Sequence, residues 1–81
     1  MEYLVQLNYD DPDLKNAHLL DANQILDNIV YMIKNNISMN RIRIYKLSID
    51  NDPQIVHISF IKNTLYIYDD HKNVIDVVSL N

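Results

Sequence analysis

Three residues of the types found in hydrolytic triads fall on one face of a predicted sheet. Ser59 and His57 share the parity of one strand, and Asp76 comes from a later strand expected nearby. In a triad, an imidazole oriented by a carboxylate takes the proton of a serine hydroxyl. A flat sheet face offers neither a pocket nor oxyanion donors, and the chain has no glycine for the turn that presents a nucleophile. We therefore predict ordinary cross-strand neighbours and no enzyme.

The sequence gives no support for a metal or cofactor site. The chain has no cysteine, which excludes thiolate chemistry and cysteine-based zinc sites. His18 and His71 stand in predicted loops without the spacing of zinc ligands. Four aspartates could surround a divalent cation, but they lack the spacing and the glycine of an EF-hand loop: Asp10, Asp13, Asp50 and Asp70. Nucleotide-binding loops also need glycine, so we predict no metal and no cofactor.

Length and composition describe one small domain, residues 1–81. At 81 residues the chain is close to the size at which one hydrophobic core becomes marginal. The formal charge of −4 weighs against nucleic-acid binding, which needs a basic face. No apolar run approaches the roughly 18 residues of a membrane span, and the first residues lack the features of a signal peptide. We expect a cytoplasmic protein without a membrane partner.

The strongest local signals predict a helix over residues 22–35. Asp21 suits the N-cap, and Gln24 three residues later completes a capping box. Apolar residues recur at helical spacing on one face: Ala22, Ile25, Leu26, Ile29, Val30 and Ile33. Asn35 and Asn36 tolerate the left-handed conformation that ends a helix in a chain without glycine.

Alternating apolar residues predict strands before and after this helix: 3–9, 40–49, 54–61, 64–70 and 74–80. A change of parity in the second strand predicts a bulge near Ile44 and Tyr45. The helical link between the first two strands favours parallel pairing by a right-handed crossover. The predicted fold is an α+β two-layer sandwich of order β-α-β-β-β-β. One helix packs on one face of a mostly antiparallel sheet.

Two turns set the registers of the last three strands. Residues 62–63 form a two-residue hairpin loop. Asp70 starts a type I turn that ends with Asn73 in the left-handed position. The resulting pairs are Phe60 with Leu65, Ile58 with Ile67, Val56 with Asp69, Ile67 with Val77 and Asp69 with Ile75. These pairs place one apolar face toward the helix.

The opposite sheet face is more apolar than solvation requires, which favours an interface. It presents ten residues: Ile55, His57, Ser59, Ile61, Tyr66, Tyr68, Val74, Asp76, Val78 and Leu80. Tyrosine is common at interfaces because it buries a large area and still offers a hydroxyl. We predict that partner or self contacts use Ile55, His57, Ile61, Tyr66, Tyr68, Val78 and Leu80. The alternative is cover from within, by the 10–20 loop or the C-terminus.

Acidic residues gather in the loops that the predicted parallel crossover places at one end of the domain. An acidic rim that binds a basic partner would contain Asp10, Asp11, Asp13, Asp50, Asp52, Asp69 and Asp70. The alternative is plain turn chemistry, because aspartate is a common turn residue.

These features indicate a small acidic, non-enzymatic protein-binding domain. Isoleucine and asparagine, both with AT-rich codons, are abundant, which is typical of phage, mobile-element and viral genes. The narrower hypothesis is an inhibitor that occludes a host protein and whose rim imitates nucleic acid. The alternatives are a self-associating structural protein, active as a homodimer, and a small nucleic-acid-binding accessory protein.

Overall fold

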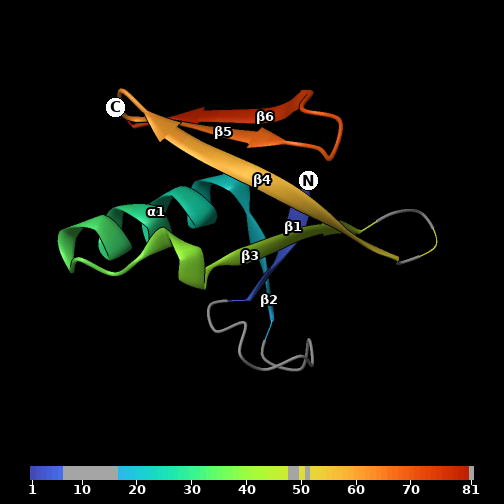
Figure 1. The fold of residues 1–81 in the computed structure, drawn as a ribbon, viewed down its shortest axis with the longest axis horizontal. Coiled ribbons are helices and arrows are strands. Elements are labelled where there is room, and N and C mark those ends of the chain that lie inside the picture. The colour runs from blue at the N-terminus through green and yellow to red at the C-terminus, as the bar shows by residue number, and fades with distance from the viewer. Residues whose placement is uncertain (7–16, 48–49, 51, 81) are drawn as a thin grey trace.

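The computed structural model describes residues 1–6, 17–47, 50 and 52–80. Its elements in chain order are β1 (Glu2–Gln6), β2 (His18–Asp21), α1 (Ala22–Lys34), the short 3-10 helix η2 (Met39–Arg41), β3 (Arg43–Leu47), β4 (Pro53–Ile61), β5 (Thr64–Tyr68) and β6 (Val74–Ser79). The helix packs against one face of an antiparallel sheet of order β2-β1-β3-β4-β5-β6 (Figure 1). The predicted α+β sandwich is confirmed.

Helix α1 begins and ends where its local signals predict. The Asp21 carboxylate accepts the Gln24 N–H at 2.9 Å, and the Gln24 side chain accepts the Asp21 N–H at 2.9 Å. Asn36 adopts the left-handed conformation after the last turn, with φ 56°. The side chains that α1 buries are Ala22, Ile25, Leu26, Ile29 and Met32. Ile33, expected on this stripe, is 49% exposed, so Met32 takes its place.

The pairing of β1 and β3 corrects the predicted crossover. Gln6 lies opposite Arg43 and Tyr3 opposite Lys46, so the two strands are antiparallel. The cause is strand β2, which lies in the segment expected to be a loop and pairs with the free side of β1. This extra strand reverses the chain before the helix starts. Consequently α1 connects β2 with β3, rather than β1 with a parallel neighbour.

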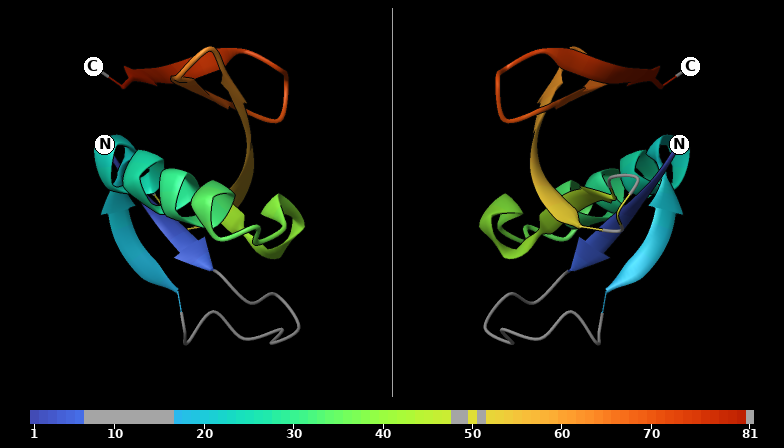
Figure 2. Two further views of the ribbon diagram at one scale, coloured as in Figure 1. Left: turned by 90° about the vertical axis from the view of Figure 1, so that its left-hand side faces the viewer. Right: turned by 90° about the vertical axis from the view of Figure 1, so that its right-hand side faces the viewer.

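The sheet bends sharply around the helix because β4 changes partners at its middle. Its first half pairs with β3 from Pro53 to Val56, and its second half pairs with β5 from His57 to Ile61. One leaf (β1, β2 and β3) therefore lies on one side of α1, and the other leaf (β5 and β6) on the opposite side, with β4 crossing between them (Figure 2). The core between the leaves contains Tyr3, Val5, Ala22, Ile25, Leu26, Ile29, Ile44, Val56, Leu65 and Ile67.

The hairpin between β4 and β5 has the predicted register. Phe60 lies opposite Leu65, and Ile58 lies opposite Ile67. Lys62 and Asn63 form the loop with positive φ values of 51° and 63°, as a two-residue type I′ turn requires. The predicted pair of Val56 with Asp69 would lie just beyond the last pair of this ladder, His57 with Tyr68.

The predicted bulge near Ile44 and Tyr45 is wrong. These two residues pair in regular succession with Val56 and Ile55. The change of parity instead reflects the two sides of β3, since Ile44 is buried while Tyr45 is only half-buried. The irregularity of this sheet lies between β5 and β6, opposite Ile67 and Tyr68.

The register of the second hairpin differs from the prediction by one residue. Ile67 lies opposite Asp76 rather than Val77, and Tyr66 lies opposite Val77. The turn starts at Asp69 rather than Asp70, and Lys72 rather than Asn73 has the left-handed conformation, with φ 67°. The bulge that follows exchanges the two faces of β6, because side chains alternate along a strand.

Candidate functional site

Strands β4, β5 and β6 have one side that faces away from the core, here called the outer face. It carries exposed aliphatic side chains around a tyrosine pair. Its members are Ile55, His57, Ser59 and Ile61 of β4, Thr64, Tyr66 and Tyr68 of β5, and Val74, Val77 and Ser79 of β6. Ile61, Val74 and Val77 are 55%, 50% and 50% exposed, and Ile55 is 41% exposed. The inward residues of the same strands belong to the core, so strand alternation alone separates the two surfaces.

Tyr66 and Tyr68 form the centre of the outer face. Their ring centroids are 6.4 Å apart with an interplanar angle of 27°, and both side chains are half-buried. The Tyr68 hydroxyl lies 3.2 Å from the Ser59 hydroxyl, within hydrogen-bond distance. Stacking and this hydrogen bond hold the two aromatic rings in a defined arrangement on the sheet. Such preorganisation lowers the entropy cost of binding.

The structure removes some predicted members from the outer face and adds others. Strand parity placed five residues on the outer face where the structure has them: Ile55, His57, Ile61, Tyr66 and Tyr68. Val78 instead packs against the core, opposite the buried Leu65. Leu80 follows the end of β6 and is 40% exposed. Val77 takes the outward position, which parity could not show because apolar residues occur at both parities of this strand.

Asp76 turns inward because its partner lies across the core. The Tyr3 hydroxyl of β1 donates a hydrogen bond to Asp76 Oδ2 of β6 at 3.0 Å. Burial, then the hydrogen bond to this carboxylate and its negative charge, raise the pKa of Tyr3 well above its ordinary value. The bond joins β1 to β6, two strands that lie far apart in the sheet order. It closes the bent sheet around α1.

The hydrolytic trio is therefore divided between the two faces. Ser59 and His57 lie on the outer face, whereas Asp76 points into the core. These three residues cannot act together as a triad. Among the described residues, no group of three or more histidine and acidic side chains is placed to hold a metal ion. Asp10 and Asp13, two members of the hypothetical cation site, lie outside those residues.

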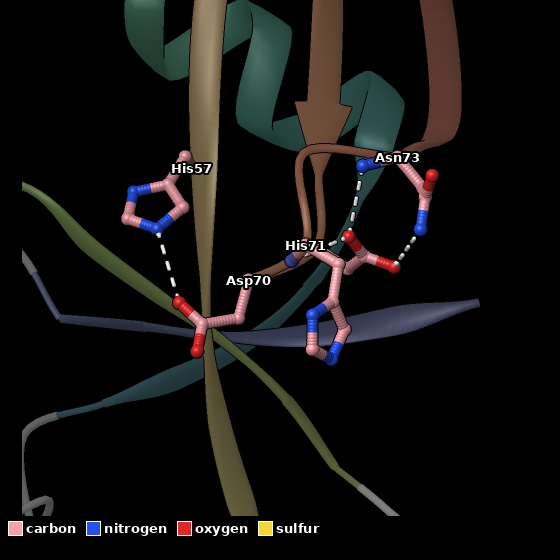
Figure 3. A network of polar contacts seen from close by, with 5 residues as sticks. His57, Asp70, His71 and Asn73 are labelled. Atoms are coloured by element: carbon pink, nitrogen blue, oxygen red, sulfur yellow. Dashed lines mark hydrogen bonds and ion pairs between the residues drawn. The ribbon is translucent and has the colours of Figure 1, made fainter.

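An acidic turn borders the outer face where β5 leads into β6. Asp69 accepts hydrogen bonds from the backbone N–H groups of Asn73 and His71, both at 2.9 Å (Figure 3). The bond from the Asn73 backbone is the main reason why the pKa of Asp69 lies below its ordinary value. Asp69 thus stabilises the turn, which leaves Asp70 as the acidic side chain that projects from it.

Asp70 projects toward β4 and meets a histidine of the outer face. Its Oδ1 lies 3.6 Å from Nε2 of His57, and the two side chains are 75% and 57% exposed (Figure 3). A shallow hollow beside this turn is lined by the polar side chains of Lys46 and Gln54 as well as by the turn itself. The hollow therefore mixes basic and acidic groups, and Ile55 of the outer face also lines it.

The structure describes four residues of the predicted acidic rim: Asp50, Asp52, Asp69 and Asp70. The prediction that the rim forms one surface depended on parallel pairing of β1 and β3, and that predicted pairing is wrong. Asp50 and Asp52 are exposed beside the start of β4, and Asp69 and Asp70 belong to the neighbouring turn. Asp10, Asp11 and Asp13 lie outside the described residues.

Comparisons of the chain with protein-family models, with curated proteins and with solved structures give no match. In the part of the chain that the structure describes, no helix has the length and apolar character to cross a membrane.

Proposed function

We propose that this protein is a non-catalytic protein-binding domain that contacts its partner through the outer face. The observation that carries this proposal is the stacked pair of Tyr66 and Tyr68 on a sheet face whose surrounding aliphatic side chains are about half exposed. Aromatic residues that lie in the centre of an interface and are rimmed by other contacts commonly provide most of the binding energy.

The shape and chemistry of the outer face suit a protein rather than a small molecule. The tyrosines of β5 lie between aliphatic neighbours on β4 and β6, so the apolar surface is broad. Small-molecule sites are instead concave and bury most of their ligand. Contiguous apolar surface with polar groups at its border is typical of protein interfaces. The Ser59 and Tyr68 hydroxyls can exchange their mutual bond for bonds to a partner.

Three exposed aspartates, here called the acidic border, suggest that the partner has a basic surface next to an apolar one. Asp50, Asp52 and Asp70 are exposed at the end of the leaf where β4 begins and the turn projects. The chain carries a formal charge of −4, so long-range attraction would favour a cationic partner. Such charges mainly raise the association rate and select among partners, while the tyrosines supply affinity.

The narrower form of this proposal is an inhibitor from a phage, another mobile element or a virus. It would occlude a basic, nucleic-acid-binding surface of a host protein in the cytoplasm. Its support is the AT-rich codon usage implied by the abundant isoleucine and asparagine, together with the acidic border. Nucleic-acid binding by the chain itself has less support, because the formal charge of −4 disfavours contacts with phosphates.

Self-association is the second candidate, because the same exposed aliphatic side chains could meet those of another copy. Light scattering coupled to size exclusion separates the two proposals. A purified protein at monomer mass that retains another protein supports partner binding. A stable dimer that retains none supports self-association through this face.

The proposal is tested by comparing immobilised wild-type protein with the Tyr66→Ala/Tyr68→Ala variant and with Leu19→Ala. Leu19 is a matched control, since it is 53% exposed on β2, far from the outer face in the sheet order. Wild type and Leu19→Ala should retain the same protein from an extract of the source cells, and the double variant should lose it. Equal retention by all three would reject the outer face as the site. Ile61→Lys, at a 55% exposed position, gives the same test without removing half-buried tyrosines.

A further inference from the structure

Strand β6 forms one edge of the sheet, and its exposed side has the chemistry of a pairing surface. Its sequence, VIDVVS, contains four β-branched aliphatic residues, no proline and one charged residue. Val74 and Val77 are each 50% exposed. The opposite edge, β2, has only four residues. Long apolar edge strands pair readily with other strands unless something blocks them.

The ladder between β5 and β6 shows which backbone groups of β6 point away from the sheet. The Leu80 N–H donates to the Asn63 carbonyl at 2.8 Å, so these residues form a hydrogen-bonded pair. Such pairs recur at every second residue of an antiparallel ladder. Val78 and Asp76 therefore direct their backbone groups toward β5. Val77 and Ser79 direct theirs toward the edge that has no neighbour among the described strands.

The Asp76 side chain covers one of these outward amides. Its Oδ1 accepts the Val77 N–H at 3.1 Å, while its Oδ2 accepts the Tyr3 hydroxyl at 3.0 Å. One carboxylate thus occupies the central amide of the edge and is itself held from across the core. Inward-pointing charged residues are a known means of preventing edge-to-edge association.

We propose that the edge of β6 is a latent pairing surface for β6 of a second copy, and that Asp76 keeps it closed. An antiparallel pair centred on Val77 needs the Val77 N–H of both copies, which is the amide that Asp76 occupies. Pairing would extend the sheet across two copies and bring their outer faces side by side. This inference concerns the strand edge and does not depend on the proposed partner-binding role of the outer face.

A second copy fits this edge because the edge is complementary to itself. Around a twofold axis at Val77, the exposed valine of each copy meets its equivalent, and such β-branched cross-strand pairs are favourable. The turn with Asp70 lies at the start of β6, and Lys62 lies next to its end, near Leu80. Antiparallel pairing brings this turn, which contains both Asp70 and Lys72, toward Lys62 of the other copy.

The test compares three variants by light scattering over a series of protein concentrations. Tyr3→Phe removes the hydroxyl but leaves Asp76 on the Val77 amide, so it should stay monomeric. Tyr3→Phe/Asp76→Val removes the hydroxyl together with its acceptor, so no buried hydroxyl loses its partner. It also exposes the Val77 amide, so the mass of this variant should rise toward twice the monomer value. Adding Val77→Pro removes the N–H, which the β5 ladder does not use, and should restore the monomer. Circular dichroism must show that each variant is folded.

A monomeric Tyr3→Phe/Asp76→Val variant that is folded would overturn the proposal, and so would association that survives Val77→Pro. Amide hydrogen exchange of the wild-type protein tests the closed state without any substitution. The Val77 amide should exchange more slowly than that of Ser79, which shares its orientation on the same edge. Equal exchange rates would show that Asp76 does not cover the edge.

Discussion

Tyr3 and Asp76 are 73 residues apart in the chain, and their side chains meet at 3.0 Å across the core. Tyr3 has no exposed surface, and its hydroxyl reaches the carboxylate of an edge strand from the opposite leaf. The contact holds the Asp76 side of β6 against the core. On the same strand, Val77 lies on the outer face and Val78 packs inside.

Replacing Tyr3 with phenylalanine should lower the free energy of unfolding by about 1–3 kcal/mol, because Asp76 loses a hydrogen bond inside the protein. Tyr45→Phe is the control, since Tyr45 is half-buried on β3 and its hydroxyl has no hydrogen bond to another of the described residues. Urea denaturation of both variants measures the difference. Equal midpoints for the two would mean that the Tyr3 hydroxyl adds nothing to stability.

The same pair predicts a loss of stability in alkaline solution. The pKa of Tyr3 is higher in the folded chain than in the unfolded chain, so the folded state keeps this proton to higher pH. The resulting stabilisation is complete below the ordinary tyrosine pKa of about 10 and is lost as the pH rises through the folded pKa. The difference in unfolding free energy between wild type and Tyr3→Phe should therefore shrink above pH of about 10. A constant difference would contradict the assignment.

The two adjacent aspartates of the 69–73 turn should behave differently. Asp69→Ala removes the acceptor of the Asn73 and His71 amides and should lower the thermal midpoint, whereas Asp70→Ala should leave it nearly unchanged. The pKa of Asp69 is lowered in the folded state, so its contribution is present above the ordinary carboxyl pKa. It is lost as the pH falls through the folded value. If Asp70→Ala proves the more damaging change, the turn begins one residue later.

The capping box of α1 gives a prediction about helix stability. Asp21→Ala should cost about 0.5–2 kcal/mol, because the Gln24 N–H loses its acceptor. Asp27→Ala is the matched control within the exposed part of the same helix and should not destabilise it. Chemical denaturation followed by circular dichroism distinguishes them. A wild-type midpoint for Asp21→Ala would show that this cap is not needed.

The acidic border should act on the rate of partner binding. Changing Asp50, Asp52 and Asp70 to asparagine should slow association with the captured protein. Asp69 is left unchanged in this variant, because the turn needs it. The slowing should fade as salt rises, because the screening length drops from about 10 Å at 0.1 M to about 3 Å at 1 M. Stopped-flow association rates at several salt concentrations measure this effect. Rates that match wild type at low salt would assign these residues to turn structure alone.

Local signals made α1 and the first hairpin predictable from sequence. The Asp21 and Gln24 pair lies within one turn, and the 62–63 loop fixes the register of the strands beside it. The antiparallel pairing of β1 with β3 was not predictable, because it depends on β2, a four-residue strand without clear alternation. Short strands of this kind are defined by the neighbour they pair with rather than by their own sequence.

The candidate site shows the same division between local and distant information. Strand parity was enough to place His57, Tyr66 and Tyr68 on one face. In β6, apolar residues stand at both parities, so either face could have been the inner one. The choice depends on a bulge next to the turn and on Tyr3 at the other end of the chain. No local pattern contains that information.

Oxidative footprinting of the tyrosines, with and without the captured partner, tests the central claim most directly. Tyr66 and Tyr68 lie on the outer face, while Tyr31 is 61% exposed on α1 and serves as the internal control. We predict that binding lowers the oxidation of Tyr66 and Tyr68 and leaves that of Tyr31 unchanged. Protection of Tyr31 with unchanged oxidation of Tyr66 and Tyr68 would contradict it, because the partner would then contact the helix instead of the sheet.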